Sequence, residues 1–140
     1  MACVMAMNLF GQTYIMSNTT INTCSGTFYD SGGSGGNYAN NQNLTMTFCS
    51  SAPGANIEMN FTSFGVENGW DFLTVYDGPN SSSPLLGTFS GIIPPGIITS
   101  TNGCLTFVFD SDYSVTQGGW TANISCTVPC QDVIASAVFN

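Results

Sequence analysis

The sequence predicts an all-β fold, either a sandwich or a barrel, on three observations. From Thr13 onward, apolar and polar residues alternate in short runs, which is the period of a strand with one buried face. Clusters of Gly, Asn, Ser and Pro separate these runs, as turns do. No stretch has the length and period of a useful helix. At 140 residues, the chain is long enough for one domain with one core.

Four of the predicted strands have alternate apolar residues that we expect to face the core. In chain order these residues are Leu44, Met46 and Phe48; Ile57, Met59 and Phe61; Leu105, Phe107 and Phe109; and Trp120, Ala122, Ile124 and Cys126. Two further runs, 72–76 and 85–89, are expected to form a pair of strands. The Gly-rich segment 31–41 and the Pro-containing segment 92–96 are predicted to be loops.

Both ends of the chain are apolar and lie outside the main pattern, so we divide the chain into 1–12, an N-terminal extension, 13–127, the domain, and 128–140, a C-terminal extension or linker. The first segment is either a leader remnant, without the usual positive start, or a strand that docks on its own domain or on a neighbour. The last segment is a final strand, a linker, or an arm for a neighbouring subunit. Its apolar residues alternate at Val133, Ala135, Ala137 and Phe139. No run reaches the roughly 18 apolar residues that span a bilayer.

The charge balance excludes several classes of function. The chain has no lysine, arginine or histidine, and its eight acidic residues give a formal net charge of −8. Nucleic acid and anionic membranes are therefore poor partners, because binding to phosphate needs basic side chains. A Ser–His or Cys–His catalytic pair is impossible, and so is a lysine Schiff base. A pair of carboxylates for glycoside hydrolysis would need a cleft that this chain has little length to build, so we expect no enzyme.

The cysteines indicate an oxidising, extracellular or cell-surface environment. Six cysteines without histidine favour disulfides over a zinc site. Two of them, Cys3 and Cys130, lie in the apolar ends of the chain. They either form a bridge within one chain or join two copies, and the distance between their Cα atoms decides between these alternatives. Five sequons mark candidate N-glycosylation sites. They begin at Asn18, Asn43, Asn60, Asn80 and Asn123.

Two acidic turns are the candidate functional site. Glu67 and Asp71 lie in a short turn between two strand-like runs, and Asp112 lies in a second turn after another such run. Because the chain has no basic side chain, these carboxylates need hydrogen bonds, protonation or a bound cation to offset their charge. A metal cation is the expected partner of such a cluster. Asp30 and Asp110 are weaker candidates.

The order of cysteines and acidic turns resembles a CUB domain over residues 13–126. The blocks that carry the resemblance are Cys24, GTFYDSGG, Cys49, FTSF, WDFLTVYDG, LLGTFSG, GCLTFVFDSD, GW and Cys126. The resemblance implies an antiparallel, jelly-roll-like β-sandwich. It also implies that Cys24 is bridged to Cys49 and that Cys104 is bridged to Cys126.

The same resemblance implies a calcium site at one end of the sandwich. Many CUB domains hold the ion with a Glu and two Asp residues, and the matching positions are Glu67, Asp71 and Asp112. Ser114 or backbone carbonyls would add further oxygens. This chain departs from the usual pattern, because Glu67 and Asp71 are only four residues apart and Trp70 replaces the usual tyrosine.

Two functions fit these observations. The first is a secreted, non-enzymatic structural module that calcium stabilises, a subunit of an extracellular fibre or surface assembly. Its apolar ends would dock on other copies of the chain. The second is a calcium-dependent module that recognises glycans or proteins for a larger secreted adhesin or hydrolase. Four aromatic residues either form a sugar platform on the loops or pack on the edge of the sandwich. They are Tyr29, Tyr38, Trp70 and Tyr113.

Overall fold

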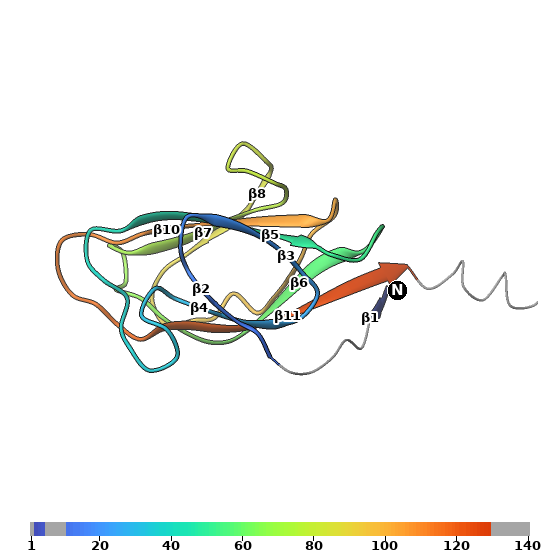
Figure 1. The fold of residues 1–140 in the computed structure, drawn as a ribbon. Coiled ribbons are helices and arrows are strands. Elements are labelled where there is room, and N and C mark those ends of the chain that lie inside the picture. Colours follow the sequence, from blue (N-terminus) through green and yellow to red (C-terminus); the bar gives the residue numbers. More distant parts are fainter. Residues whose placement is uncertain (1, 5–10, 130–140) are drawn as a thin grey trace, which may run out of the picture.

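The computed structural model describes the backbone of residues 2–4 and 11–129 and the side chains of residues 11–128. Within this part, two β-sheets pack face to face as a sandwich, and no helix occurs (Figure 1). The described residues therefore contain no helix long enough to cross a membrane. The predicted all-β sandwich is confirmed.

The larger sheet has six strands. Five lie in the order β2 (Thr13–Ile15), β4 (Gly26–Tyr29), β11 (Gly119–Pro129), β6 (Asn56–Gly65) and β9 (Ile97–Thr99). The sixth, β1 (Ala2–Val4), pairs with the last residues of β11. All pairings in this sheet are antiparallel except that of β2 with β4.

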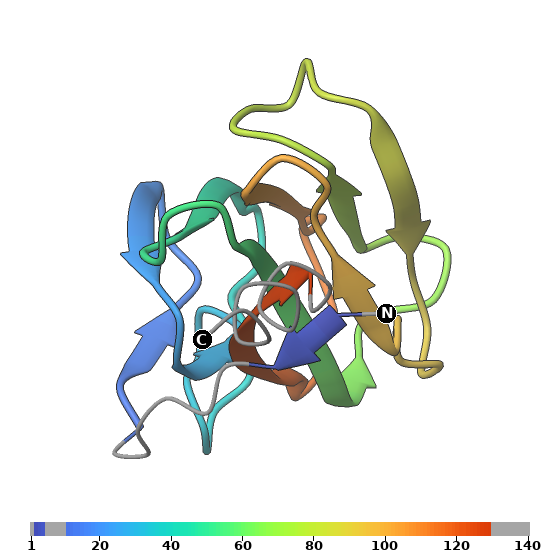
Figure 2. The same ribbon diagram turned by 90° about the vertical axis from the view of Figure 1, so that its right-hand side faces the viewer.

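The smaller sheet has five strands. Their order is β3 (Thr19–Thr23), β5 (Asn43–Ser50), β10 (Cys104–Asp110), β7 (Phe72–Tyr76) and β8 (Leu85–Phe89). Here β3 and β5 are parallel and the other pairs are antiparallel. Strand β8 lies at one edge of this sheet, and β9 lies at one edge of the larger sheet. Figure 2 shows that these two edges are on the same side of the sandwich, opposite β2 and β3.

The core lies between the sheets and uses the inward residues that alternation predicts. All of them are buried except Leu44, which is half-buried near the start of β5. Aromatic rings dominate the centre: Phe28 contacts Phe48, Phe107 and Trp120 with centroid distances of 4.8, 5.2 and 5.6 Å. Edge-to-face and tilted rings of this kind stabilise the packing beyond the area they bury.

The disulfide pairing implied by the resemblance is wrong in this structure. Cys24 is bridged to Cys126 and Cys49 to Cys104, with Cα–Cα distances of 5.0 and 4.1 Å. The strand register explains both bridges. Cys49 and Cys104 are directly opposed on β5 and β10, and the pairing of Ile124 with Gly26 places position 126 opposite position 24. Each cysteine is therefore joined to its neighbour across the strands.

The two ends of the sandwich hold different parts of the chain. Strand β1 pairs Ala2 with Pro129 and Val4 with Thr127, so this part of the N-terminal extension docks on its own domain. It lies at one end of the molecule, and the loops that follow β6 and β10 lie at the other (Figure 1). Cys130 and residues 133–139 lie outside the described residues, so the predictions for them stay untested, and so do the domain boundaries.

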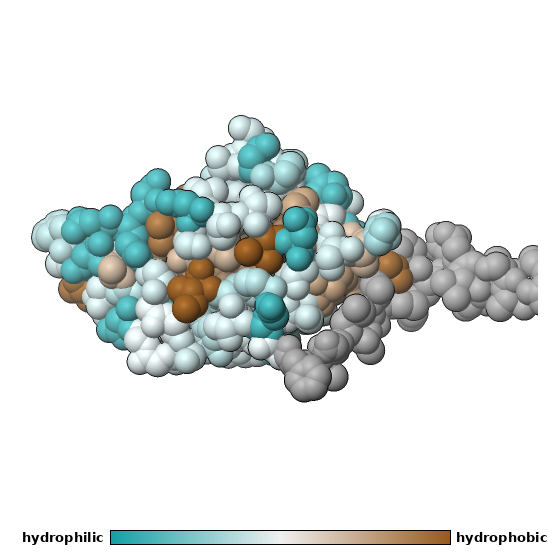
Figure 3. Space-filling view, viewed as in Figure 1, coloured by the Kyte–Doolittle hydropathy of each residue, from teal (hydrophilic) through white to brown (hydrophobic). Residues whose placement is uncertain are grey.

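Figure 3 shows one face of the sandwich, over β2 to β5, in which hydrophobic residues are scattered among hydrophilic ones. Isolated apolar side chains of this kind are normal on a soluble protein surface. This face therefore gives no sign of a binding surface.

Candidate metal centre

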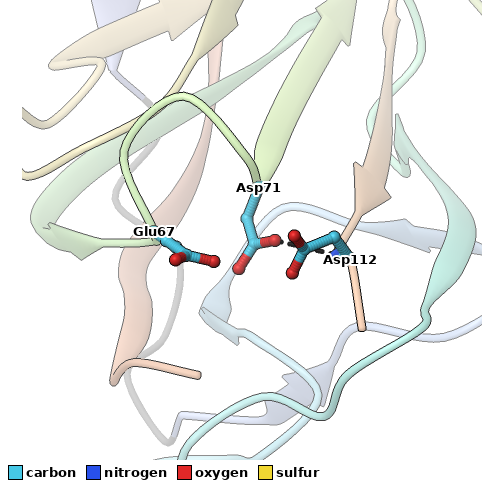
Figure 4. A group of neighbouring side chains, drawn as sticks. All are labelled: Glu67, Asp71 and Asp112. Carbon is cyan, nitrogen blue, oxygen red and sulfur yellow. Dashed lines mark hydrogen bonds between the residues drawn. The ribbon is translucent and has the colours of Figure 1, made fainter. Parts of the chain in front are cut away.

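Three carboxylates converge at one end of the sandwich. Glu67, Asp71 and Asp112 each offer an oxygen, and these oxygens all lie within 4.8 Å of one another. Figure 4 shows the three side chains pointing toward a common space, two from the β6–β7 turn and one from the segment after β10. The structure thus brings together the three residues that the sequence singles out.

Hydrogen bonds fix the β6–β7 turn in spite of its short length. The backbone N–H of Asp71 donates to the carbonyl of Glu67 at 3.0 Å. The hydroxyl of Ser90 donates to the carbonyl of Asp71 at 2.8 Å and accepts from the N–H of Gly69 at 2.8 Å. Gly69 has a φ of +81°, a conformation that side chains disfavour. The four-residue spacing therefore still aims both carboxylates inward.

Asp71 is the buried centre of the cluster. Its Oδ2 accepts a 2.5 Å hydrogen bond from the hydroxyl of Tyr38, and its Oδ1 accepts from the backbone N–H of Asp112 at 2.9 Å. The Tyr38 hydroxyl also accepts from the N–H of Glu67 at 3.0 Å. Burial, and then the hydrogen bond to Asp71, raise the pKa of Tyr38 well above its ordinary value, so it stays a donor. Tyr38 thus joins Glu67 and Asp71, and Asp71 in turn reaches Asp112.

Glu67 carries the least satisfied oxygen of the cluster. Its Oε2 is sheltered from solvent and has no hydrogen-bond partner among the described residues. Burial raises the pKa of Glu67, and the nearby charges of Asp112 and Asp71 raise it further. A buried acceptor without a donor is unfavourable, and so are like charges at close range. A cation in the shared space would relieve both.

Asp112 is held in place by two main-chain N–H groups. Its Oδ1 accepts from the N–H of Ser114 at 3.1 Å, and its carbonyl accepts from the N–H of Asn41 at 2.7 Å. Ser114 therefore contacts the cluster through its main chain, while its side chain is half-buried and makes no hydrogen bond to the described residues. Its proposed role as a ligand stays a prediction.

The residues present fit a calcium ion. All the available ligand atoms are oxygens, which is what this hard cation prefers, and the described residues around them supply no nitrogen or sulfur ligand. The orphaned Oε2 of Glu67 is the observation that points to a missing positive partner. Glu67, Asp71 and Asp112 would hold the ion.

The weaker candidates do not join the cluster. Asp110 is exposed and accepts a hydrogen bond from the side-chain amide of Asn43. Asp30 is fully buried, packs beneath Gly119 and accepts from the N–H of Gly32 at 2.9 Å. Burial raises the pKa of Asp30 to about 6. Neither residue is part of the three-carboxylate group.

The four aromatic residues of the predicted sugar platform differ in their exposure to solvent. Tyr38 is buried and Tyr29 is half-buried, whereas Trp70 and Tyr113 are 63% and 77% exposed. The exposed pair directly adjoins the cluster, since each is next in sequence to one of its aspartates. Sequence reasoning missed the supporting roles of Tyr38 and Ser90, because their hydrogen bonds join segments far apart in the chain.

The sequons all present their asparagine to solvent. Asn18, Asn43, Asn60, Asn80 and Asn123 are exposed. Attachment of glycans there stays a prediction. Asn60 and Asn123 lie directly opposite each other on β6 and β11.

Comparison with known proteins matches the chain to one family of domains. The CUB domain family profile matches residues 17–124. Human cubilin is 34% identical over 96 residues, which cover 66% of this chain and 3% of cubilin. The zinc metalloproteinase nas-39 of Caenorhabditis elegans is 36% identical over 90 residues, which cover 61% of this chain and 10% of that protein. The chain thus spans a small fraction of these relatives.

Solved structures share the fold. The extracellular region of zebrafish Gpr126/Adgrg6 superposes with a TM-score of 0.69 and 21% identity, covering 81% of this chain and 15% of that one. The MASP-1 CUB2 domain bound to Ca²⁺ superposes with a TM-score of 0.65 and 20% identity, covering 78% and 98%. At this level of identity, the likeness establishes the architecture alone.

Proposed function

Because the chain belongs to the CUB domain family, which supplies non-catalytic modules for protein interaction, we propose that it is a calcium-dependent recognition module that works outside the cell. Its ligand would be a protein or a glycan, and the module would serve a larger secreted protein such as an adhesin or a hydrolase. The disulfides support an oxidising location.

The convergence of Glu67, Asp71 and Asp112 carries this proposal. When bound, Ca²⁺ supplies the positive charge that the chain lacks. Asp71 and Asp112 would then be held together across two loops that are 41 residues apart in sequence. The exposed rings of Trp70 and Tyr113 adjoin these aspartates and give the partner large aromatic surfaces, which often dominate binding. Loss of the ion would loosen both rings together.

The resemblance to a calcium-bound relative supports the choice of ion. The MASP-1 CUB2 structure is described as bound to Ca²⁺. The ligand set here is made of oxygens alone, as this cation requires. The carboxylate spacing in the β6–β7 turn is held by Ser90, so the short turn is no obstacle to binding.

Calorimetric titration of Ca²⁺ into metal-depleted protein tests the proposal. We expect one site per chain and a rise in the melting temperature with calcium. Asp112→Asn should weaken binding at least about tenfold, since affinity follows the number of charged ligands. Asp110→Asn is the matched control and should bind as the unaltered chain does. No heat and no change in melting temperature at millimolar calcium would contradict the proposal.

A second candidate function is that of a structural subunit in an extracellular assembly of copies of this chain. The specific observation that favours it is a group of exposed apolar residues within segment 85–97. Negative-stain microscopy of the native material separates the two functions. Regular fibres would support the second, whereas isolated particles that capture a ligand only with calcium would support the first.

A further inference from the structure

An open groove lies at the end of the sandwich that holds β1. Its volume is about 610 Å³, and its lining comes from the ends of β5 and β10 and the turns beside them, residues 49–50, 52–56 and 101–104. Asn56 in this lining pairs with Thr127, and Thr127 also pairs with Val4 of β1. The groove, which we call the terminal groove, is therefore at the end opposite the three carboxylates (Figure 1).

The Cys49–Cys104 disulfide is part of the lining of the terminal groove. The two cysteines are directly opposed on β5 and β10, and both are half-buried. Their sequence neighbours Phe48 and Leu105 are core residues. Because successive side chains of a strand point to opposite faces, the bridge is turned away from the core and toward the surface.

The Cys24–Cys126 bridge is far less accessible. Cys24 is 5% exposed, and Cys126 is fully buried within the core. Thiol–disulfide exchange begins when a thiolate reaches one of the two sulfurs, so its rate depends on access. Access therefore favours attack on Cys49–Cys104.

Charge also favours attack in the terminal groove. A thiolate is an anion, and the chain has a net charge of −8. None of the described lining residues is charged. Asp77 contacts Thr101 of the lining, but it is 7% exposed and its two oxygens accept from the N–H and the hydroxyl of Thr101. Five of the eight acidic residues lie instead at the opposite end, namely Asp30, Glu67, Asp71, Asp110 and Asp112.

Hydrogen bonds hold the walls of the terminal groove together without the bridge. The N–H of Ser50 donates to the carbonyl of Gly103 at 2.8 Å, and the N–H of Gly103 donates to Oδ1 of Asn56 at 3.0 Å. Strands β5 and β10 are paired along their whole length, from Asn43 and Asp110 to the two cysteines. The sulfurs should therefore stay close together after reduction, so that the bridge can form again.

We propose that Cys49–Cys104 is a reversible redox site whose reductant is a dithiol. One thiolate of the dithiol attacks a sulfur of the bridge and forms a mixed disulfide, and the other cysteine leaves as a thiolate that takes up a proton. The second thiol of the reductant then attacks the mixed disulfide, which releases the second cysteine as a thiol and leaves the reductant as a disulfide. Two electrons and two protons pass from the dithiol to the protein. This chemistry is separate from the proposed calcium-dependent recognition and needs no ion.

Limited reduction by dithiothreitol in EDTA, without denaturant, tests the proposal. Free thiols are trapped with iodoacetamide, the remaining bridges are reduced in denaturant and labelled with a heavy form of the reagent, and mass spectrometry measures both labels at each cysteine. We expect Cys49 and Cys104 to be trapped at least about tenfold faster than Cys24 and Cys126. The near-ultraviolet circular dichroism of the folded chain should persist at that stage. Oxidised dithiothreitol should restore the bridge.

A charge variant tests the route through the terminal groove. Asn102 is an exposed residue of the lining. Asn102→Asp should slow the reduction of Cys49–Cys104 roughly twofold to fivefold at low salt, and less at high salt, because the added carboxylate repels the thiolate. Asn123→Asp is the matched control. It adds the same charge at an exposed position of β11 outside the lining and should leave the rate nearly unchanged.

Three results would overturn the proposal. The first is trapping of Cys24 and Cys126 as fast as Cys49 and Cys104. The second is loss of the folded circular dichroism signal as soon as Cys49–Cys104 is reduced, because the site would then not be reversible within the fold. The third is equal slowing by Asn102→Asp and Asn123→Asp, which would show that the reductant does not enter through the terminal groove.

Discussion

The hydroxyl of Tyr38 donates a 2.5 Å hydrogen bond to the carboxylate of Asp71, and neither side chain is more than 1% exposed. Tyr38→Phe removes this donor and also the acceptor of the Glu67 N–H. We expect a loss of roughly 1–3 kcal/mol in the free energy of unfolding, because a buried carboxylate oxygen loses its partner. Urea unfolding in EDTA measures it. Tyr113→Phe, at an exposed position, should change little.

Buried Asp30 should make stability depend on pH. Burial raises the pKa of Asp30 from 3.8 to about 6, so the folded protein binds more protons than the unfolded chain between these values. The contribution of Asp30 to the free energy of unfolding is fully present below pH 3.8 and is lost as the pH rises through about 6. Asp30→Asn, which keeps an acceptor for the Gly32 N–H, should flatten that decline. Urea midpoints measured across this range in EDTA give the slope.

The control for this prediction is Asp110→Asn, which removes an exposed carboxylate and should keep the original slope. Some slope should survive in Asp30→Asn, because Glu67 also has a raised pKa and acts in the same direction. The interpretation of Asp30 fails when its asparagine variant keeps the full pH dependence of the unaltered chain.

The disulfide pairing can be read from peptides without reduction. Cyanogen bromide cleaves after Met46 and Met59, which separates Cys24 from Cys49. With the bridges seen here, fragments 17–46 and 47–59 should each be joined to fragment 60–140. Mass spectrometry of the digest distinguishes this from the pairing that the family resemblance implies. A species made of fragments 17–46 and 47–59 alone would contradict the structure.

Two sequons compete for the same space. Asn60 and Asn123 are directly opposed on neighbouring strands, where side chains start about 5 Å apart. We expect glycans on one or the other, never on both in one molecule. Intact mass and peptide mapping of protein secreted from a cell with N-glycosylation machinery measure the occupancy. Peptides glycosylated at both positions in one molecule would refute this expectation.

The alternation of apolar residues was a reliable guide to the core. Met59 and Phe107 are fully buried as expected, because a strand with one buried face leaves a period of two in its own sequence. The same signal was weaker for 85–89, where Leu85 is 60% exposed. An edge strand lacks a neighbour on one side, and its sequence does not show this.

Long-range contacts are what the sequence could not supply. The bridge from Cys24 to Cys126 depends on the register between β4 and β11, which are about a hundred residues apart. The candidate site could be predicted because its two acidic turns lack any basic partner in the chain and match the positions of the carboxylates in CUB domains. The role of Tyr38 was missed, since nothing near it in sequence indicates that its hydroxyl reaches Asp71.

Strand β1 lies beside the last residues of β11, so the chain enters and leaves the described fold about one strand spacing, or 5 Å, apart. A domain with neighbouring entry and exit points can be inserted into a loop of an unrelated host protein with little distortion of the host. In such an insertion, the sandwich would project from the host protein, and its three carboxylates would lie at the end farthest from the host.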